Sequence, residues 1–117
     1  LPELRRQDLK NRQNSTDDME PWLVRWYKWR MERHFQAGMN LYQKMLKDGV
    51  AKESARFVLP LATPTRLYMT GSVRSWVHYI ELRSGHGTQK EHMDIANACK
   101  DVFKEQFPIV SEALGWM

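Results

Sequence analysis

The sequence predicts an α+β fold that is mostly helical, in the order long helix, short helix, one or two strands, then two or three helices. Apolar residues recur at helical spacing in a long segment before residue 48 and in shorter segments after residue 72. A threonine-rich stretch between these segments favours a strand. Proline and glycine residues fall between the segments and indicate where each element ends.

Residues 1–17 are predicted to be a loop-like lead-in. They carry no apolar period and are rich in turn-forming residues, namely Pro2, Asn11, Asn14, Ser15 and Thr16. The long helix should begin near Asp17 or Asp18, since either carboxylate can accept hydrogen bonds from the free N–H groups of a first turn. Pro21 then falls where a first-turn proline is tolerated.

The long helix should end at about Lys47, because Asp48-Gly49 can form a left-handed cap. Three tryptophans, at 22, 26 and 29, widen its apolar stripe. At helical spacing tryptophans form core or helix–helix contacts more often than they stack on bases. The stripe itself comprises Leu23, Tyr27, Met31, Phe35, Gly38, Met39, Tyr42 and Met45.

The middle of the chain should contain a short helix and a strand. Lys52 to Phe57 favours a helix, which Pro60 stops. Leu61–Thr70 is the best strand candidate, because Leu67, Tyr68 and Met69 lie among several threonines.

The last third of the chain should be helical. One helix begins at Gly71 or Ser72 and ends near Arg83, before a Ser-Gly-His-Gly break. A second helix follows from about Thr88 to Gln106, and Pro108 opens a short final one. The expected buried face of the second helix comprises Met93, Ala96, Cys99, Val102 and Phe103.

The composition excludes several classes of protein. A length of 117 residues suits one small domain, and no run of eighteen apolar residues could span a membrane. The first residues lack the apolar core of a signal peptide, so we expect a cytoplasmic location. A lone cysteine, Cys99, excludes an internal disulfide and favours a buried structural thiol over a nucleophile. The four histidines, His34, His78, His86 and His92, are spaced poorly for a metal site.

The positive charge is concentrated in the middle of the chain. The formal net charge is +4, and residues 44–90 hold eight basic and three acidic side chains. The arginines there, Arg56, Arg66, Arg74 and Arg83, are scattered and form no polybasic run. Such arginines suit a concave site for a phosphorylated small molecule. A basic helical nucleic-acid-binding module, suggested also by the aromatic-rich long helix, is the alternative.

Several motifs resemble one enzyme family. Residues 48–60, Asp-Gly-Val-Ala-Lys-Glu-Ser-Ala-Arg-Phe-Val-Leu-Pro, resemble the G-V-x-x-E-x-A-R-x-V-L-P run of flavin-dependent thymidylate synthases (the ThyX family). The similarity is dense from about Tyr42 to Pro108. It continues through Pro64-Thr65, Thr70, Ser72-Val73-Arg74-Ser75-Trp76, His78-Tyr79, Leu82-Arg83, Gln89, Glu91 and Pro108.

The resemblance implies synthesis of dTMP from dUMP with 5,10-methylenetetrahydrofolate as one-carbon donor, FAD as cofactor and NADPH as reductant. Arg56 matches the arginine that holds dUMP, where a doubly charged phosphate suits a bidentate cation. Arg83 matches the catalytic arginine that contacts the uracil of dUMP and helps to ionise it. Ser72, Arg74 and His78 match positions that contact FAD.

The chain also departs from the family pattern. Ser72 replaces the commoner asparagine, and His78 lies where members vary between histidine and asparagine. Gly87 stands where some members carry a flavin-contacting histidine, a contact that is missing unless His86 substitutes.

The family signature R-H-R-x-x-S-x-N-E-x-S-x-R-Y is absent from the 117 residues. The chain therefore resembles the C-terminal half of such an enzyme, so that residues 1–117 form a partial domain. The family builds its active sites between the subunits of a homotetramer. We accordingly expect self-association, little or no catalysis by the chain alone, and neither a membrane nor a nucleic-acid partner.

Overall fold

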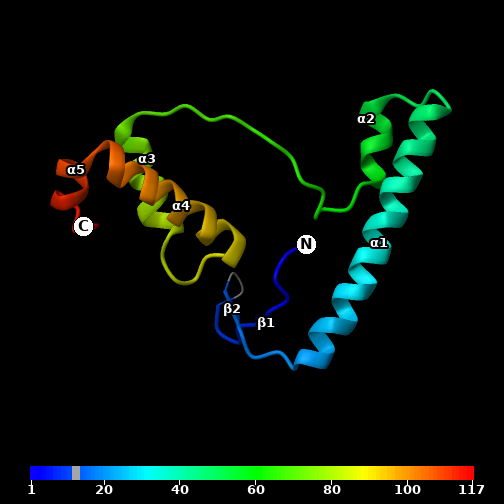
Figure 1. Ribbon diagram of the computed structural model, residues 1–117, viewed down its shortest axis with the longest axis horizontal. Coiled ribbons are helices and arrows are strands. Elements are labelled where there is room, and N and C mark those ends of the chain that lie inside the picture. The colour runs from blue at the N-terminus through cyan, green and yellow to red at the C-terminus, as the bar shows by residue number, and fades with distance from the viewer. Residues whose placement is uncertain (12–13) are drawn as a thin grey trace. The chain divides into compact units, whose positions relative to one another are not determined.

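Figure 1 shows a computed structural model of the chain, which describes residues 1–11 and 14–117. The chain divides into two compact units. Unit 1 comprises residues 1–4 and 18–68, and unit 2 comprises residues 5–17 and 69–117. Arg12 and Gln13, which belong to the predicted lead-in, lie outside the described residues.

Unit 1 is dominated by helix α1, Pro21–Lys47. The helix begins later than predicted, because its N-cap is Glu20 and neither Asp17 nor Asp18 caps it. Pro21 occupies the first turn. Backbone N–H groups there make no intrahelical hydrogen bond, so proline costs none, and its fixed φ suits the helix. The proline therefore sets the start of the helix more strongly than the two aspartates.

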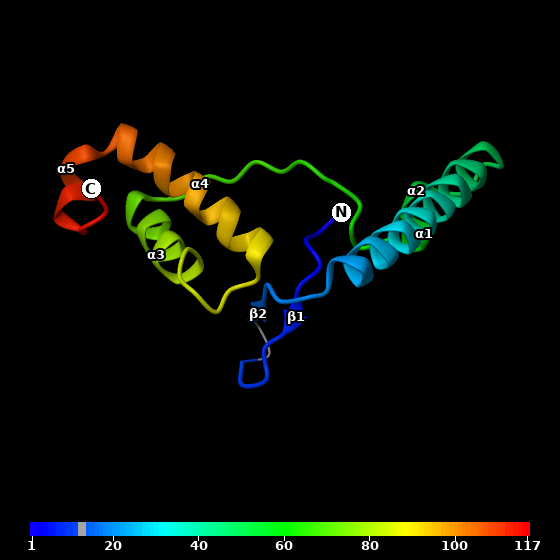
Figure 2. The same cartoon turned by 60° about the horizontal axis from the view of Figure 1, so that its bottom comes forward.

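A left-handed turn at Gly49, whose φ is 83°, ends α1 as predicted. The chain then returns along α1 as helix α2, Lys52–Ala55, and the 3-10 turn η1, Arg56–Val58, as Figures 1 and 2 show. The predicted short helix over 52–57 is thus present, with a tighter last turn. Extended backbone at Leu59, before Pro60, stops it.

Gly38 of α1 allows the returning chain to approach closely. A Cβ atom at residue 38 would lie 2.9 Å from Pro60 Cδ and 3.2 Å from the Val58 carbonyl oxygen. The first distance is shorter than real Cβ atoms show and the second is tighter than most real contacts, and the neighbours are a rigid ring and the backbone. The packing of η1 on α1 therefore requires glycine at this position.

The strand predicted over Leu61–Thr70 is wrong, because residues 63–72 form neither helix nor strand. A strand needs a neighbour to pair its backbone N–H and C=O groups. No described segment pairs with this one, and Leu67, Tyr68 and Met69 are exposed.

Unit 2 contains a two-stranded sheet, the one sheet found among the described residues. Strands β1, Arg6–Gln7, and β2, Ser15–Thr16, pair antiparallel, with Arg6 opposite Thr16 and Gln7 opposite Ser15. The lead-in that was predicted as loop-like therefore folds back on itself as a hairpin. The prediction of one or two strands in a mostly helical α+β fold is confirmed, although their position was misplaced.

Three helices complete unit 2. They are α3, Val73–Arg83, α4, Lys90–Gln106, and α5, Pro108–Ala113, and their order and approximate bounds agree with the predictions. Helices α3 and α4 lie side by side in Figures 1 and 2. The buried apolar side chains of this unit come from these two helices: Ile80, Ala96 and Phe103.

Much apolar surface is left uncovered. Val102 was predicted to be buried on α4 but is 60% exposed, since no described element covers its side of the helix. Tyr27 and the three tryptophans of α1 are exposed too. The accessible surface is 9737 Å², whereas about 8,000 Å² is expected even for two separate compact bodies of half this length.

Cys99 was predicted to be buried but is half-buried, and it lines an apolar hollow together with Trp76 and Ile80. Among the described residues, no helix combines the length and the apolar character that crossing a membrane requires.

Replacing Gly38 with alanine is predicted to destabilise unit 1 by about 1–3 kcal/mol, because the new methyl group overlaps Pro60 and Val58. Helix propensity alone would favour alanine by about 1 kcal/mol, so the sign of the change tests the contact. Urea unfolding followed by circular dichroism measures it. Gln43→Ala, on an exposed position of the same helix, is the control, and a stabilised Gly38→Ala protein would contradict the packing.

Candidate functional site

The three residues predicted to contact FAD are the N-cap of α3 and two residues in the first half of this helix. Ser72 is the N-cap, and its Oγ accepts a hydrogen bond from the Ser75 N–H at 3.1 Å. Arg74 and His78 are exposed and four residues apart, so they project from one face of the helix. Neither side chain has a hydrogen bond or ion pair within the described residues. Ser72 thus has a structural role, while Arg74 and His78 are available to a ligand.

Arg83 ends α3 and lines a polar cavity of about 370 Å³. Arg83 as a whole is half-buried, and its guanidinium makes no hydrogen bond or ion pair with any described residue. The other lining residues come from the hairpin, from the loop before α4 and from the first turn of α4; they are Gln7, Asn14, Ser15, Thr88, Gln89 and His92. An unpaired cation in a polar hollow is suited to an anionic or carbonyl-bearing ligand.

Tyr79 lies one turn before Arg83 on α3. Its ring packs edge-on against Trp76, and the ring centroids of Tyr79 and His92 are 5.6 Å apart. Burial raises the pKa of the Tyr79 phenol, Cys99 raises it further, and the positive charge of Arg83 opposes both effects. The phenol is therefore protonated at neutral pH, and Arg83 has no anionic partner there.

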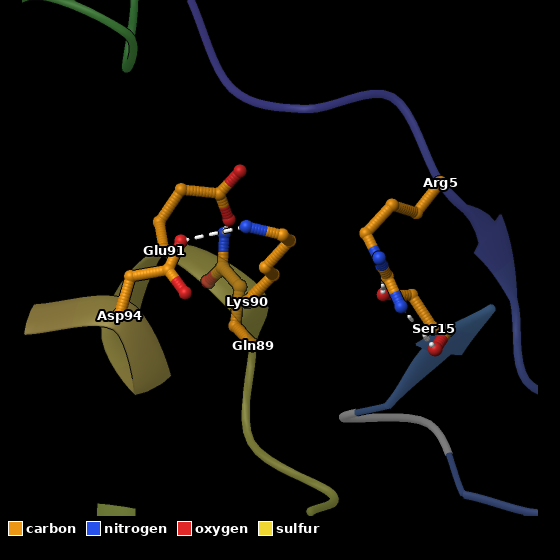
Figure 3. A network of polar contacts seen from close by, with 6 residues as sticks. All are labelled: Arg5, Ser15, Gln89, Lys90, Glu91 and Asp94. Atoms are coloured by element: carbon orange, nitrogen blue, oxygen red, sulfur yellow. Dashed lines mark hydrogen bonds and ion pairs between the residues drawn. The ribbon is translucent and has the colours of Figure 1, made fainter. Parts of the chain in front are cut away.

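Figure 3 shows polar contacts of residues that line this cavity or lie next to the lining residues in the sequence. On the hairpin, Arg5 Nε donates to Ser15 Oγ at 2.8 Å, and Arg5 Nη2 donates to the Ser15 carbonyl at 3.2 Å. At the start of α4, Lys90 Nζ and Asp94 Oδ2 form an ion pair at 2.7 Å. These contacts order the backbone that carries the lining residues.

Asp8 organises the hairpin loop. Its Oδ1 accepts hydrogen bonds from the backbone N–H groups of Lys10, at 2.8 Å, and Asn11, at 3.3 Å. Its Oδ2 accepts one from Asn14 Nδ2 at 2.9 Å. These bonds, those to the Lys10 and Asn11 backbone most of all, lower the pKa of the Asp8 carboxyl. The ionised carboxylate therefore holds the loop together.

Arg56, the residue that matches the dUMP-holding arginine, belongs to unit 1. It opens η1, is exposed and makes no side-chain hydrogen bond or ion pair with a described residue. With Lys52 and Tyr42 it lines an open hollow of about 590 Å³. Two cations beside one hollow favour a phosphate, although Glu53 also lines it.

A family model described as thymidylate synthase complementing protein matches residues 2–109. The chain belongs to this family. It is 51% identical over 111 residues to a probable flavin-dependent thymidylate synthase of Paramecium bursaria Chlorella virus 1, which covers 95% of this chain and 51% of that protein. The chain therefore spans about half the length of that relative.

Two further relatives in the family give the same picture. A flavin-dependent thymidylate synthase of Synechocystis is 49% identical over 114 residues, covering 97% of this chain and 53% of the relative. One from Kosmotoga olearia is 35% identical over 118 residues, covering 97% of this chain and 50% of the relative. The suspected family resemblance is confirmed.

Sequence reasoning missed the hairpin side of the Arg83 cavity. Gln7, Asn14 and Ser15 were assigned to a loop-like lead-in. The turn-forming types Asn14 and Ser15 were a signal for a turn, but no sequence signal connected them to Arg83. His92 was weighed only as a metal ligand. Among the described residues no three His, Cys, Asp or Glu side chains gather as a metal site would require.

Ser72→Ala is predicted to speed amide exchange of Ser75 about fivefold, because loss of an N-cap costs about 1 kcal/mol. Ser72→Asn should preserve the slow exchange, since asparagine caps equally well. Hydrogen exchange followed by NMR measures both variants. Equal exchange in the alanine and asparagine variants would contradict the capping role.

The hairpin loop of this family member is predicted to open only in strong acid. Since the pKa of Asp8 is lowered in the folded loop, its contribution is present above the ordinary value of 3.8 and is lost as the pH falls through the lower folded value. An NMR pH titration of the Lys10 and Asn11 amides measures this. Asp8→Asn should abolish the transition, and a midpoint at or above 3.8 would contradict the hydrogen bonding.

Proposed function

We propose that this chain is the C-terminal half of a flavin-dependent thymidylate synthase that methylates dUMP reductively to dTMP. The observation that carries the proposal is Arg83, a half-buried residue that lines a polar cavity with no described partner for its guanidinium. Its position resembles that of the family's nucleotide-contacting arginine. The names of relatives that are 49–51% identical over nearly the whole chain support the activity.

Two arginines serve dUMP in this proposal. Arg56 holds the nucleotide, because a permanently charged fork of N–H donors matches the oxygens of a phosphate. Arg83 contacts the uracil and stabilises the negative charge that must develop before C5 can attack. Since no described residue engages either guanidinium, neither has to break a protein contact to bind the substrate.

Arg74 and His78 fit a dinucleotide such as FAD. Both are exposed, lie on one face of α3 and have no protein partner among the described residues, so a cation and an imidazole are available to phosphate and ring atoms. Ser72 fits less directly, because its Oγ caps the helix. Bound FAD supplies the hydride of the reduction, with NADPH as reductant and 5,10-methylenetetrahydrofolate as one-carbon donor.

The exposed apolar side chains support the proposal that this chain associates with another protein chain. Helix α1 has no buried residue, and exposed apolar side chains occur in both units. Surface of this kind is typical of protein interfaces. The chain therefore self-associates, with a homotetramer as the active state, and catalyses little on its own. We propose a cytoplasmic location for the enzyme.

The test is a hybrid enzyme in which the first half of the Synechocystis relative is joined to Leu1. The hybrid is predicted to bind FAD and form dTMP, whereas Arg83→Ala should lower kcat/KM for dUMP at least 100-fold, because the charge that develops on the uracil loses its cation. Initial rates of dTMP formation and the flavin absorbance measure these outcomes.

Arg66→Ala is the matched control, since Arg66 is equally cationic but exposed in a segment without regular structure. It should retain activity within about threefold. A folded hybrid that binds no flavin would contradict the proposed function, and normal activity of Arg83→Ala would contradict the role of Arg83.

A further inference from the structure

Arg83 shares its cavity with residues far away in sequence. Gln7, Asn14 and Ser15 of the hairpin face the same cavity as Arg83, and all belong to unit 2. The volume, about 370 Å³, lies within the range of small-molecule sites. The family motifs that assign residue roles lie after Tyr42, so they assign no role to the hairpin.

Hydrogen bonds link the described residues of the hairpin. Gln7 Nε2 donates to three loop carbonyls, those of Asp8, Asn11 and Asn14, at 3.2–3.3 Å. The carboxylate of Asp8 holds the loop from the other side through Lys10, Asn11 and Asn14. A wall that is ordered before a ligand arrives loses little entropy when the ligand binds.

The hairpin also meets the loop before α4 at a specific point. Gly87 has a φ of 99°, and a Cβ atom there would lie 3.1 Å from Asn11 Nδ2. A side chain at residue 87 would therefore be strained and would press on the hairpin. The amide of Asn11 occupies this space, so the hairpin forms one side of the cavity.

The chemistry of the two sides is complementary. Arg83 provides only N–H donors. Asn14 is half-buried, and its Nδ2 is bound to Asp8, while its Oδ1 has no hydrogen-bond partner among the described residues. Among the residues that line this cavity, Arg83 offers charged donors and Asn14 offers a free amide acceptor, which suits a ring that carries carbonyl oxygens beside an N–H group, as uracil does.

We propose that Asn14 is a specificity-determining residue, which accepts a hydrogen bond from the ring N–H of uracil while Arg83 binds a carbonyl oxygen. The inference rests on the proposed function and extends it to the hairpin. Cytosine presents an acceptor where uracil has its ring N–H, so Asn14 also disfavours dCMP.

The test uses the hybrid enzyme and two variants. Asn14→Ala should raise the KM for dUMP about five- to tenfold, with kcat changed less than twofold, since one neutral hydrogen bond is lost. The ratio of the dCMP inhibition constant to the dUMP KM should fall by a similar factor. Asn14→Ser, whose shorter side chain places its hydroxyl away from the position of the amide oxygen, should show the same loss of preference.

Leu9→Ala is the control, because Leu9 is fully exposed on the same hairpin and does not line the cavity. Its KM and its preference for dUMP over dCMP should be unchanged. Amide exchange at Gln7 and Ser15 reports whether the hairpin is folded in each variant.

The inference is overturned if both Asn14 variants match Leu9→Ala in KM and in preference while Arg83→Ala impairs dUMP use. It is also overturned if Asn14→Ala changes the KM but Asn14→Ser, with a folded hairpin, does not. The proposed function fails instead when the folded hybrid binds no flavin and forms no dTMP, and the role of Arg83 fails when Arg83→Ala behaves like the control.

Discussion

A shortage of buried apolar surface is the constraint on which the rest of the structure depends. Among the described residues the buried apolar side chains are Ala55, Ile80, Ala96 and Phe103. The free energy gained from hydrophobic burial scales with the area removed from water. A core of this size therefore gives little stabilisation. Local devices therefore hold the elements: proline at helix starts, glycine where chains approach closely, and pairwise packing of helices within each unit.

The polar hairpin follows from the same constraint. With almost no apolar core of its own, it is ordered by the hydrogen bonds of Gln7 and Asp8 and by its contact with the loop at Gly87. Gln7 and Asn14, which make hydrogen bonds within the hairpin, also line the cavity around Arg83. The guanidinium of Arg83 has no partner among the described residues. The polar residues that stabilise the hairpin in place of a hydrophobic core therefore also line the site.

Local features of the fold were predictable from the sequence, whereas features that depend on distant partners were not. The glycine cap at residue 49, the helix after Ser72 and the proline before α5 follow from short-range chemistry, and each is present. The strand over 61–70 has the right residue types but no neighbour to pair with. Arg83 was found through a motif, but its hairpin wall lies about seventy residues away and no spacing rule connects them.

The central claim is that Arg83 and the hairpin together form a nucleotide site in a member of the thymidylate synthase complementing protein family. The most direct test is a crystal structure of the hybrid enzyme with dUMP. The account predicts the pyrimidine between the two sides of the cavity, with a carbonyl oxygen within hydrogen-bonding distance of Arg83 and the ring N–H facing Asn14. A pyrimidine that is bound away from both residues would contradict it.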